Sequence, residues 1–202
     1  MSRFAFAILA LAVGQSLFLG AMIGDRISLL RSPVVVTLET QPIDPRDIFR
    51  GDYVILSYAI TTLATGDLDG DDEFQRGDAI YVELETDGKI SRPVAIWRNM
   101  PEQTTGNAVI RGTVSYVASN MPVADLPGSE AAPSPQGCPG CGEITVNYGI
   151  ESYFVPEGEG RELENRRDAG QLTIDVALGS DGTPAIKQLR LDGEPVYTEP
   201  LF

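Results

Sequence analysis

The chain opens with a long apolar stretch, from Phe4 to Gly24, that contains no charged residue. Gln15 and Ser16 are its polar interruptions. About 20 consecutive apolar residues are enough for a helix to cross the hydrocarbon core of a bilayer. The pattern therefore predicts a transmembrane helix over residues 4–24, preceded by a short flank of residues 1–3.

A cleaved signal peptide is the alternative for this stretch. Signal peptides have a shorter apolar region and small residues at the first and third positions before the cut. The nearest pairs place a large residue at the third position: Leu19/Ala21, Phe18/Gly20 and Met22/Gly24. We favour an uncleaved signal anchor, with cleavage kept as the alternative.

After the apolar stretch, the pattern changes to short runs that are typical of β-strands. Residues 79–85 alternate apolar and polar side chains, which predicts Ile80, Val82 and Leu84 on a buried face. Asp-Gly at residues 87–88 predicts a hairpin turn into the next strand. The expected strands are residues 34–40, 53–60, 79–85, 90–97, 108–117, 143–155, 171–178 and 185–191.

These elements predict a mainly β fold, an antiparallel sandwich or partly closed barrel, preceded by one N-terminal transmembrane helix. Residues 25–32 are expected to form a juxtamembrane linker, and residues 33–202 the β domain. Within this domain we expect an acidic loop at 61–75, a Pro/Gly-rich loop at 119–142 and a short helix at 161–169.

Three expected strands follow an Arg-Gly pair. The segments are RGDYVILSY at 50–58, RGDAIYVEL at 76–84 and RGTVSY at 111–116. Glycine adopts backbone conformations that strain other residues, and Asp stabilises turns through its side chain. Because the third segment lacks the Asp, we predict that glycine is what the start of each strand requires.

The charge of the chain limits its partners. It has 15 Lys and Arg against 29 Asp and Glu, a formal net charge of −14, and no His. A nucleic-acid partner is not expected, because phosphate binding needs a basic surface. The absence of His removes a Ser-His-Asp triad and the commonest zinc ligand. No cofactor is indicated.

One motif is specific enough to suggest a family. The residues Gly51, Asp52, Tyr53, Leu56 and Tyr58 fit the pattern Gly-Asp-Tyr-x-x-Leu-x-Tyr. The chain thus resembles the GDYXXLXY family of bacterial membrane-anchored proteins, and its segments 45–50 and 148–158 are also similar to that family. The resemblance implies an N-terminal membrane segment, a β-rich outer domain and a gene that is often encoded beside those of polytopic membrane proteins. It supplies no catalytic residue.

We therefore expect a single-pass protein of the cytoplasmic (inner) membrane, with its domain outside the cytoplasm, that acts as an accessory or scaffold for a polytopic membrane partner and not as an enzyme. The motif is interpreted as mainly structural, because Leu56 and Tyr58 share one face of a strand. Partner contact is predicted at Arg46, Phe49 and Arg50, an aromatic residue between arginines in an acidic chain.

A membrane-tethered hydrolase is the first alternative. It would use Ser57 with Lys89 or Lys187, the chain's only lysines, as nucleophile and base. It could instead use paired carboxylates. The candidate carboxylates are Glu151, Glu157, Glu159 and Glu162.

An outer binding domain for a soluble or metal ligand is the second alternative. The candidate calcium ligands are Asp67, Asp69, Asp71 and Asp78. They have the alternate spacing of a calcium loop, but Asp72 occupies the position where the sharp turn of such a loop needs Gly.

Cys138 and Cys141 form a Cys-x-x-Cys pair inside the Pro/Gly-rich loop. A thioredoxin-like site would place such a pair at a helix start, and zinc would need further Cys or His ligands. We predict a local disulfide in an oxidising compartment. Trp97 is expected in the core.

Overall fold

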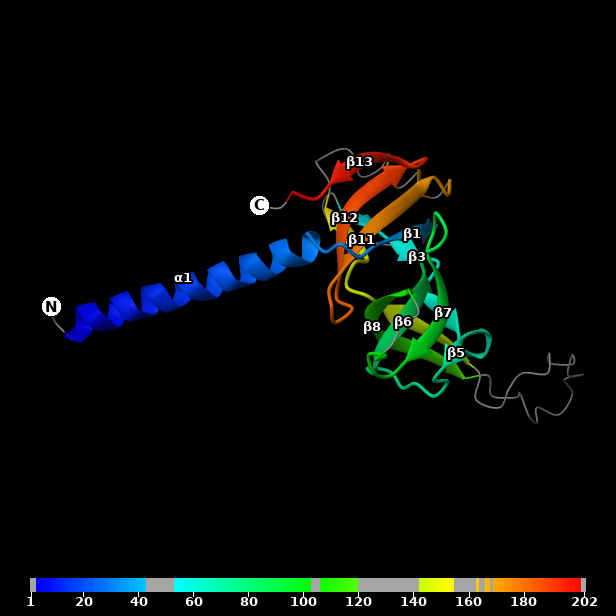
Figure 1. Cartoon of the computed structure of the whole chain (residues 1–202), viewed down its shortest axis with the longest axis horizontal. Coiled ribbons are helices and arrows are strands. Elements are labelled where there is room, and N and C mark those ends of the chain that lie inside the picture. Colours follow the sequence, from blue (N-terminus) through cyan, green and yellow to red (C-terminus); the bar gives the residue numbers. More distant parts are fainter. Residues whose placement is uncertain are drawn as a thin grey trace, which may run out of the picture.

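The computed structural model of the chain describes residues 3–42, 53–102, 106–119, 142–154, 163, 166–167 and 169–200. It has one N-terminal helix and is otherwise mainly β, with two sheets of which one curls into a half-barrel. Figure 1 shows the helix leaving the β domain as a single rod. The predicted fold class is confirmed.

Helix α1 (Arg3–Leu30) carries the predicted span. By length and composition, Phe6–Leu30 is a candidate membrane span, and its most apolar part is not buried inside the protein. The helix continues past Gly24, so most of the linker expected at 25–32 is helical. The physical reason is local: no Gly or Pro interrupts the chain between Gly24 and Pro33, and Leu30 is buried against the domain.

The first sheet has five strands in the order β13-β12-β11-β1-β3, and all its neighbours are antiparallel. Asp-Gly at 181–182 makes the turn between β11 and β12, as is typical of this dipeptide in hairpins. Its strands are β1 (Val35–Gln41), β3 (Ser57–Tyr58), β11 (Leu172–Leu178), β12 (Pro184–Leu191) and β13 (Glu194–Thr198).

The second sheet has six strands in the order β4-β9-β8-β6-β7-β5. Its neighbours are antiparallel except β5 and β7, which run parallel. The predicted hairpin at 87–88 joins β6 to β7. Its strands are β4 (Thr62–Ala64), β5 (Asp69–Gly70), β6 (Ala79–Glu85), β7 (Arg92–Trp97), β8 (Ala108–Ser119) and β9 (Gly142–Asn147), and the 3-10 helix η1 (Thr65–Asp67) lies between β4 and β5.

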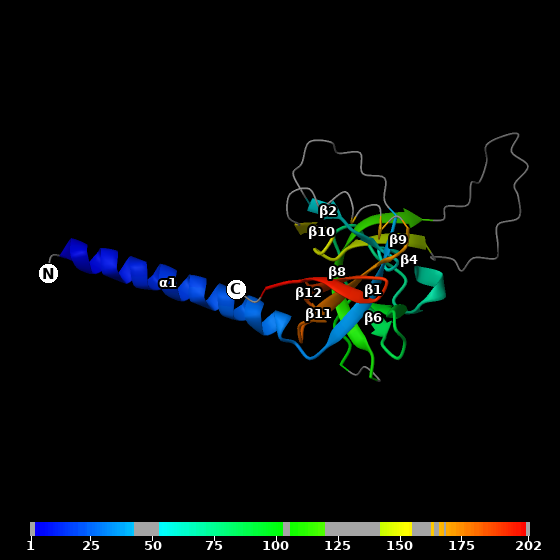
Figure 2. The ribbon, with the colours of Figure 1, turned by 90° about the horizontal axis from the view of Figure 1, so that it is seen from above.

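A two-stranded ribbon connects the sheets. It pairs β2 (Tyr53–Ile55) with β10 (Ser152–Phe154), and Figure 2 shows it on the side of the domain from which α1 departs. The prediction of single strands over 53–60 and 143–155 is therefore wrong. Both strands are interrupted because β2 and β3 pair with different partners, while a turn separates β9 from β10.

The apolar core is continuous across both sheets. Ile80, Val82 and Leu84 are fully buried, as the alternation predicts. Backbone hydrogen bonds also join segments of the two sheets: Ser91 N donates to Thr37 O over 2.8 Å, and Arg111 N donates to Gly182 O over 2.8 Å. The two sheets therefore form one folded unit around a shared core.

The glycine prediction holds at one of its three positions. Gly77 has a positive φ of 95° and lies just before β6, as expected of a glycine that starts a strand. Gly112 instead lies inside β8, so the prediction is wrong there. A Cβ at Gly112 would come 2.4 Å from Val146 Cγ1 and 3.0 Å from Tyr148 Cδ1, so close packing is what requires glycine. Gly51 lies outside the described residues.

Candidate functional site

The described part of the Gly-Asp-Tyr-x-x-Leu-x-Tyr motif lies where the chain passes from the ribbon into the five-stranded sheet. Leu56 is 1% exposed and Tyr58 is fully buried. Both side chains belong to the continuous core, which agrees with a shared buried face. Gly51, Asp52 and the side chain of Tyr53 lie outside the described residues.

Tyr58 and a second buried tyrosine, Tyr148, are linked by two reciprocal hydrogen bonds. The hydroxyl of Tyr58 donates to the carbonyl of Ile150. The hydroxyl of Tyr148 donates to the carbonyl of Ile60 over 2.7 Å. Each tyrosine thus satisfies a backbone carbonyl two residues after the other. We call Tyr58, Ile60, Tyr148 and Ile150 the tyrosine latch.

Glu151 completes the turn that carries one half of the latch. Its carboxylate accepts a hydrogen bond from Tyr148 N, and its backbone carbonyl accepts one from Leu56 N over 2.8 Å. Burial raises the pKa of both Tyr58 and Tyr148 well above the ordinary value, and the charge of Glu151 raises it further. The two phenols therefore remain neutral hydrogen-bond donors at ordinary pH.

Arg167 is a second buried polar residue beside the motif. It is helical and fully buried, and its guanidinium donates to the carbonyl of Ile55 on β2. The sequence analysis missed it, because the Arg-Arg pair at 166–167 has the composition of a solvated helix face. Nothing local distinguishes the buried arginine from its exposed neighbour Arg166. The motif strands are thus supported by three separated parts of the chain: β1, the turn at Tyr148–Glu151 and Arg167.

The sequence also matches a known protein family. The family model described as GDYXXLXY protein matches residues 15–189, which include the second half of α1, the motif and the latch. This chain belongs to the GDYXXLXY family. The searches of curated proteins and of solved structures found no match. The resemblance suggested by the five motif residues is therefore confirmed over most of the chain.

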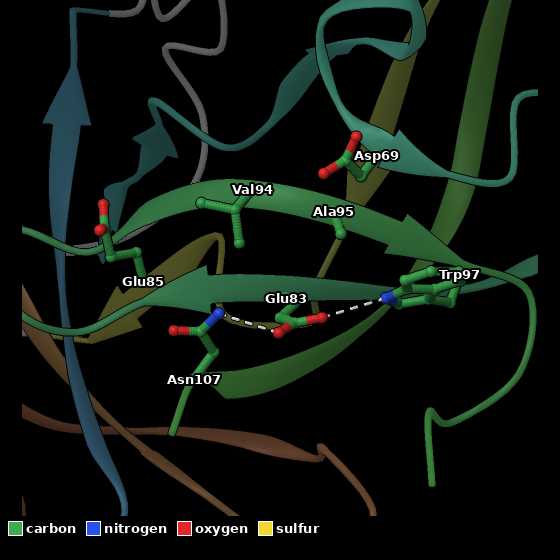
Figure 3. A pocket seen from close by; sticks show the side chains of 7 residues that line it. All are labelled: Asp69, Glu83, Glu85, Val94, Ala95, Trp97 and Asn107. Carbon is green, nitrogen blue, oxygen red and sulfur yellow. Dashed lines mark hydrogen bonds between the residues drawn. The ribbon is translucent and has the colours of Figure 1, made fainter. Parts of the chain in front are cut away.

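A second feature of this GDYXXLXY protein is a shallow acidic pocket of about 360 Å³ on the six-stranded sheet. Figure 3 shows the Glu83 carboxylate between the side chains of Asn107 and Trp97. Asn107 Nδ2 donates to Glu83 over 2.9 Å, and Trp97 Nε1 donates to the other oxygen over 3.3 Å. Asp69 and Glu85 also line the pocket. Trp97 is half-buried at this pocket, which differs from the expected core position.

The structure does not gather the four candidate calcium ligands. The carboxylate of Asp71 accepts from the backbone N of Arg98 over 2.8 Å. The carboxylate of Asp78 accepts from the backbone N of Gln75 over 2.8 Å. Asp67 lies in η1 and Asp69 in the acidic pocket. Within the described ranges, no group of three or more Asp, Glu, Cys or His side chains is placed to hold a metal ion.

The residues considered for hydrolysis lie on separate elements. Ser57 pairs with Gln41 of β1 at the edge of the five-stranded sheet. Lys89 lines a shallow pocket beside the β6–β7 turn, and Lys187 lies on β12. The carboxylate of Glu151 accepts a hydrogen bond from Tyr148 N in the turn that carries one half of the tyrosine latch. The hydrolase alternative thus gains no assembled pair among the residues described.

Several predicted site residues lie outside the described part of the chain. These are the partner-contact candidates Arg46, Phe49 and Arg50, the cysteines Cys138 and Cys141, and the carboxylates Glu157, Glu159 and Glu162. Their proposed roles stay predictions.

The third feature is the junction between α1 and the β domain. Leu30 is 3% exposed and packs on the domain. The Ser32 hydroxyl donates to Leu178 O, and Leu178 N donates to Val34 O over 3.0 Å. Arg26 forms an ion pair with Glu199 at 3.9 Å. Because these contacts flank the end of the helix, the described structure contains no free linker between helix and domain.

Proposed function

We propose that this GDYXXLXY protein is a membrane-anchored extracytoplasmic scaffold that presents its β domain to a polytopic membrane partner in a fixed orientation. The junction carries this proposal. A flexible linker would give a tethered domain reach but no preferred orientation. Here the helix that contains the candidate span continues without a break to Leu30, whose side chain is buried against the domain. A rigid connection is useful when the domain must meet its partner at a fixed distance from the membrane and in a fixed orientation.

The exposed surface of α1 favours the proposal of a partner within the membrane. Ser16, Gly20 and Gly24 recur at intervals of four residues and therefore lie along one face of the helix. The space where Gly20 and Gly24 would carry a Cβ is open, because no atom other than those of the adjoining helix backbone lies within 4 Å. Small residues at this spacing let transmembrane helices approach closely. The signal-like N-terminus favours the cytoplasmic membrane with the domain outside.

The rigid junction is tested by inserting Gly-Ser-Gly-Ser between Arg31 and Ser32. We expect cross-linking between the β domain and its membrane partner in native membranes to fall severalfold, while thermal melting of the domain changes little. The insertion of the same four residues after Asp87, in the exposed β6–β7 turn, is the control. Unchanged cross-linking in the junction variant would contradict the proposal.

The membrane contact is tested separately with Gly20→Leu. This change fills the open helix face and should reduce co-purification of the partner from detergent-solubilised native membranes. Ala7→Leu adds the same side chain on a different face of the helix and should have little effect. Equal recovery with both variants would exclude this face as the contact.

A further inference from the structure

A cavity of about 430 Å³ lies at the junction, between the end of α1 and the turn that joins β11 to β12. Figure 1 shows the end of α1 beside these two strands. One wall comes from residues spaced three or four apart, which share one side of a helix: Asp25, Ser28, Leu29 and, just after α1, Ser32. The opposite wall includes Asp181 and Thr183 of the turn. We call this cavity the junction pocket.

Both walls of the junction pocket are held in place by the chain itself. A Cβ at Gly179 would lie 3.3 Å from Leu29 Cδ1, so the helix end and the turn are in close contact. The carboxylate of Asp181 accepts from Thr183 Oγ1 over 2.7 Å and from Thr183 N over 3.1 Å. The pocket is therefore built before any ligand enters it.

The polar groups of the junction pocket suit a cation that donates several hydrogen bonds. The carboxylate of Asp25 forms no hydrogen bond or ion pair with any residue that the structure describes. The hydrogen bonds from Thr183 lower the pKa of Asp181, and Arg111, at 3.9 Å, balances only this second carboxylate. No Lys or Arg of the described chain lines the pocket. A primary ammonium, with three N–H donors and one positive charge, matches these acceptors.

The sequence gives the depth of the junction pocket. Asp25 directly follows the uncharged stretch, which ends at Gly24. At about 1.5 Å per residue, the helix rises about 6 Å from Gly24 to Ser28. The headgroup layer extends about 5–7 Å from the hydrocarbon core on each side. With the core ending at Gly24, the helix wall of the pocket lies among the headgroups.

We propose that the junction pocket binds the ammonium group of phosphatidylethanolamine in the leaflet on the domain side. This inference rests on the membrane anchoring proposed above. Among headgroups, phosphatidylcholine has a quaternary ammonium without an N–H donor, and anionic lipids are repelled by a chain whose net charge is −14. A bound headgroup at Asp25 and Asp181 fixes the depth of the junction, and with it the orientation of the β domain over the leaflet.

The experiment uses the full chain in nanodiscs with equal amounts of phosphatidylethanolamine and phosphatidylcholine that have identical acyl chains. Native mass spectrometry identifies the lipids that the chain retains on release. Asp25→Asn removes the charge with little change in shape, whereas Ser28→Leu fills the junction pocket and keeps both carboxylates. Asp87→Asn, in the exposed β6–β7 turn, is the control. Thermal melting checks that each variant is folded.

We expect the wild type and Asp87→Asn to retain phosphatidylethanolamine severalfold over phosphatidylcholine, and both pocket variants to lose this preference without a change in melting. A preference that persists in Ser28→Leu would reflect surface charge and overturn the pocket. Equal retention of the two lipids by the wild type would also overturn the pocket and leave the anchor intact. Failure of the wild type to co-elute with the nanodiscs would instead overturn the anchoring itself.

A second readout uses the unaltered chain in native membranes and so does not depend on the folding of a variant. A water-soluble carbodiimide joins a carboxylate to a primary amine in contact with it, which leaves an amide bond. Peptide mass spectrometry then identifies what is coupled to Asp25 or Asp181. Phosphatidylethanolamine at either position supports the inference, whereas coupling to a lysine of another protein overturns the lipid as the occupant.

Discussion

Tyr58 and Tyr148 each donate a hydroxyl hydrogen bond to the backbone carbonyl two residues after the other. The arrangement joins the family motif to the turn at Tyr148–Glu151, which lies far along the chain. It explains why the buried position at the end of the motif is tyrosine and not a purely apolar residue. A phenylalanine would fill the same space but would leave a buried carbonyl without its donor.

The hydroxyl of Tyr58 should therefore contribute to stability. We expect Tyr58→Phe to lower the free energy of unfolding by about 1–3 kcal/mol, because Ile150 O then loses its partner in the core. Tyr148→Phe should cost a similar amount, and the double variant less than the two single losses combined, since both act on one structure. Urea unfolding of the full chain in detergent measures all three. Tyr116→Phe, at an exposed site, is the control and should be nearly neutral. Equal stability of the Tyr58→Phe variant and the wild type would contradict the latch.

Alkaline pH should weaken the fold through the same tyrosines. Burial raises the pKa of Tyr58 and Tyr148, and burial with Glu199 raises the pKa of Tyr153 to about 12. A tyrosine of the unfolded chain ionises near pH 10. The stability is thus complete below about pH 10 and is lost as the pH rises toward the folded-state pKa values, by at most about 1.4 kcal/mol per pH unit for each buried tyrosine. Urea midpoints measured from about pH 8 to 11.5 test this, and a flat profile would exclude it.

Gly112 should be intolerant of any side chain. A Cβ there meets Val146 and Tyr148, so Gly112→Ala should destabilise the protein by about 1–3 kcal/mol through overpacking. Val146→Ala removes the nearest methyl group and should recover part of the loss in the double variant. Thr113→Ala, at the exposed neighbouring position on β8, is the control. If Gly112→Ala melts with the wild type, close packing is not the reason for this glycine.

Asp175 forms a buried polar contact within the five-stranded sheet. It is 5% exposed, accepts from the Thr37 hydroxyl over 2.8 Å and pairs with Arg190 Nε at 2.7 Å. We expect Asp175→Asn to cost about 1–3 kcal/mol, because the guanidinium of Arg190 loses its charged acceptor. Asp87→Asn changes the same group in an exposed turn and should be nearly neutral. Thermal melting of both variants measures this difference in stability, and equal melting temperatures would contradict the prediction.

Much of the architecture is encoded in local patterns. The uncharged stretch determines the helix, and alternation determines β6 and its buried residues, because both depend on spacing along one segment. The Asp-Gly hairpins at 87–88 and 181–182 are local for the same reason. The shared buried face of Leu56 and Tyr58 also follows from spacing, and it is the part of the motif site that could be predicted.

Other features depend on residues that are distant in sequence. The pairing of Tyr58 with Tyr148, the burial of Arg167 and Asp175 and the need for Gly112 were decided by the tertiary structure. The motif strand breaks at Leu56 because β2 and β3 find different partners, which no local pattern records. The acidic pocket likewise forms from separate strands. The period of the sequence determines which face of its strand a side chain occupies. The residues that cover that face are determined only by the packing of the sheets, which depends on segments distant in sequence.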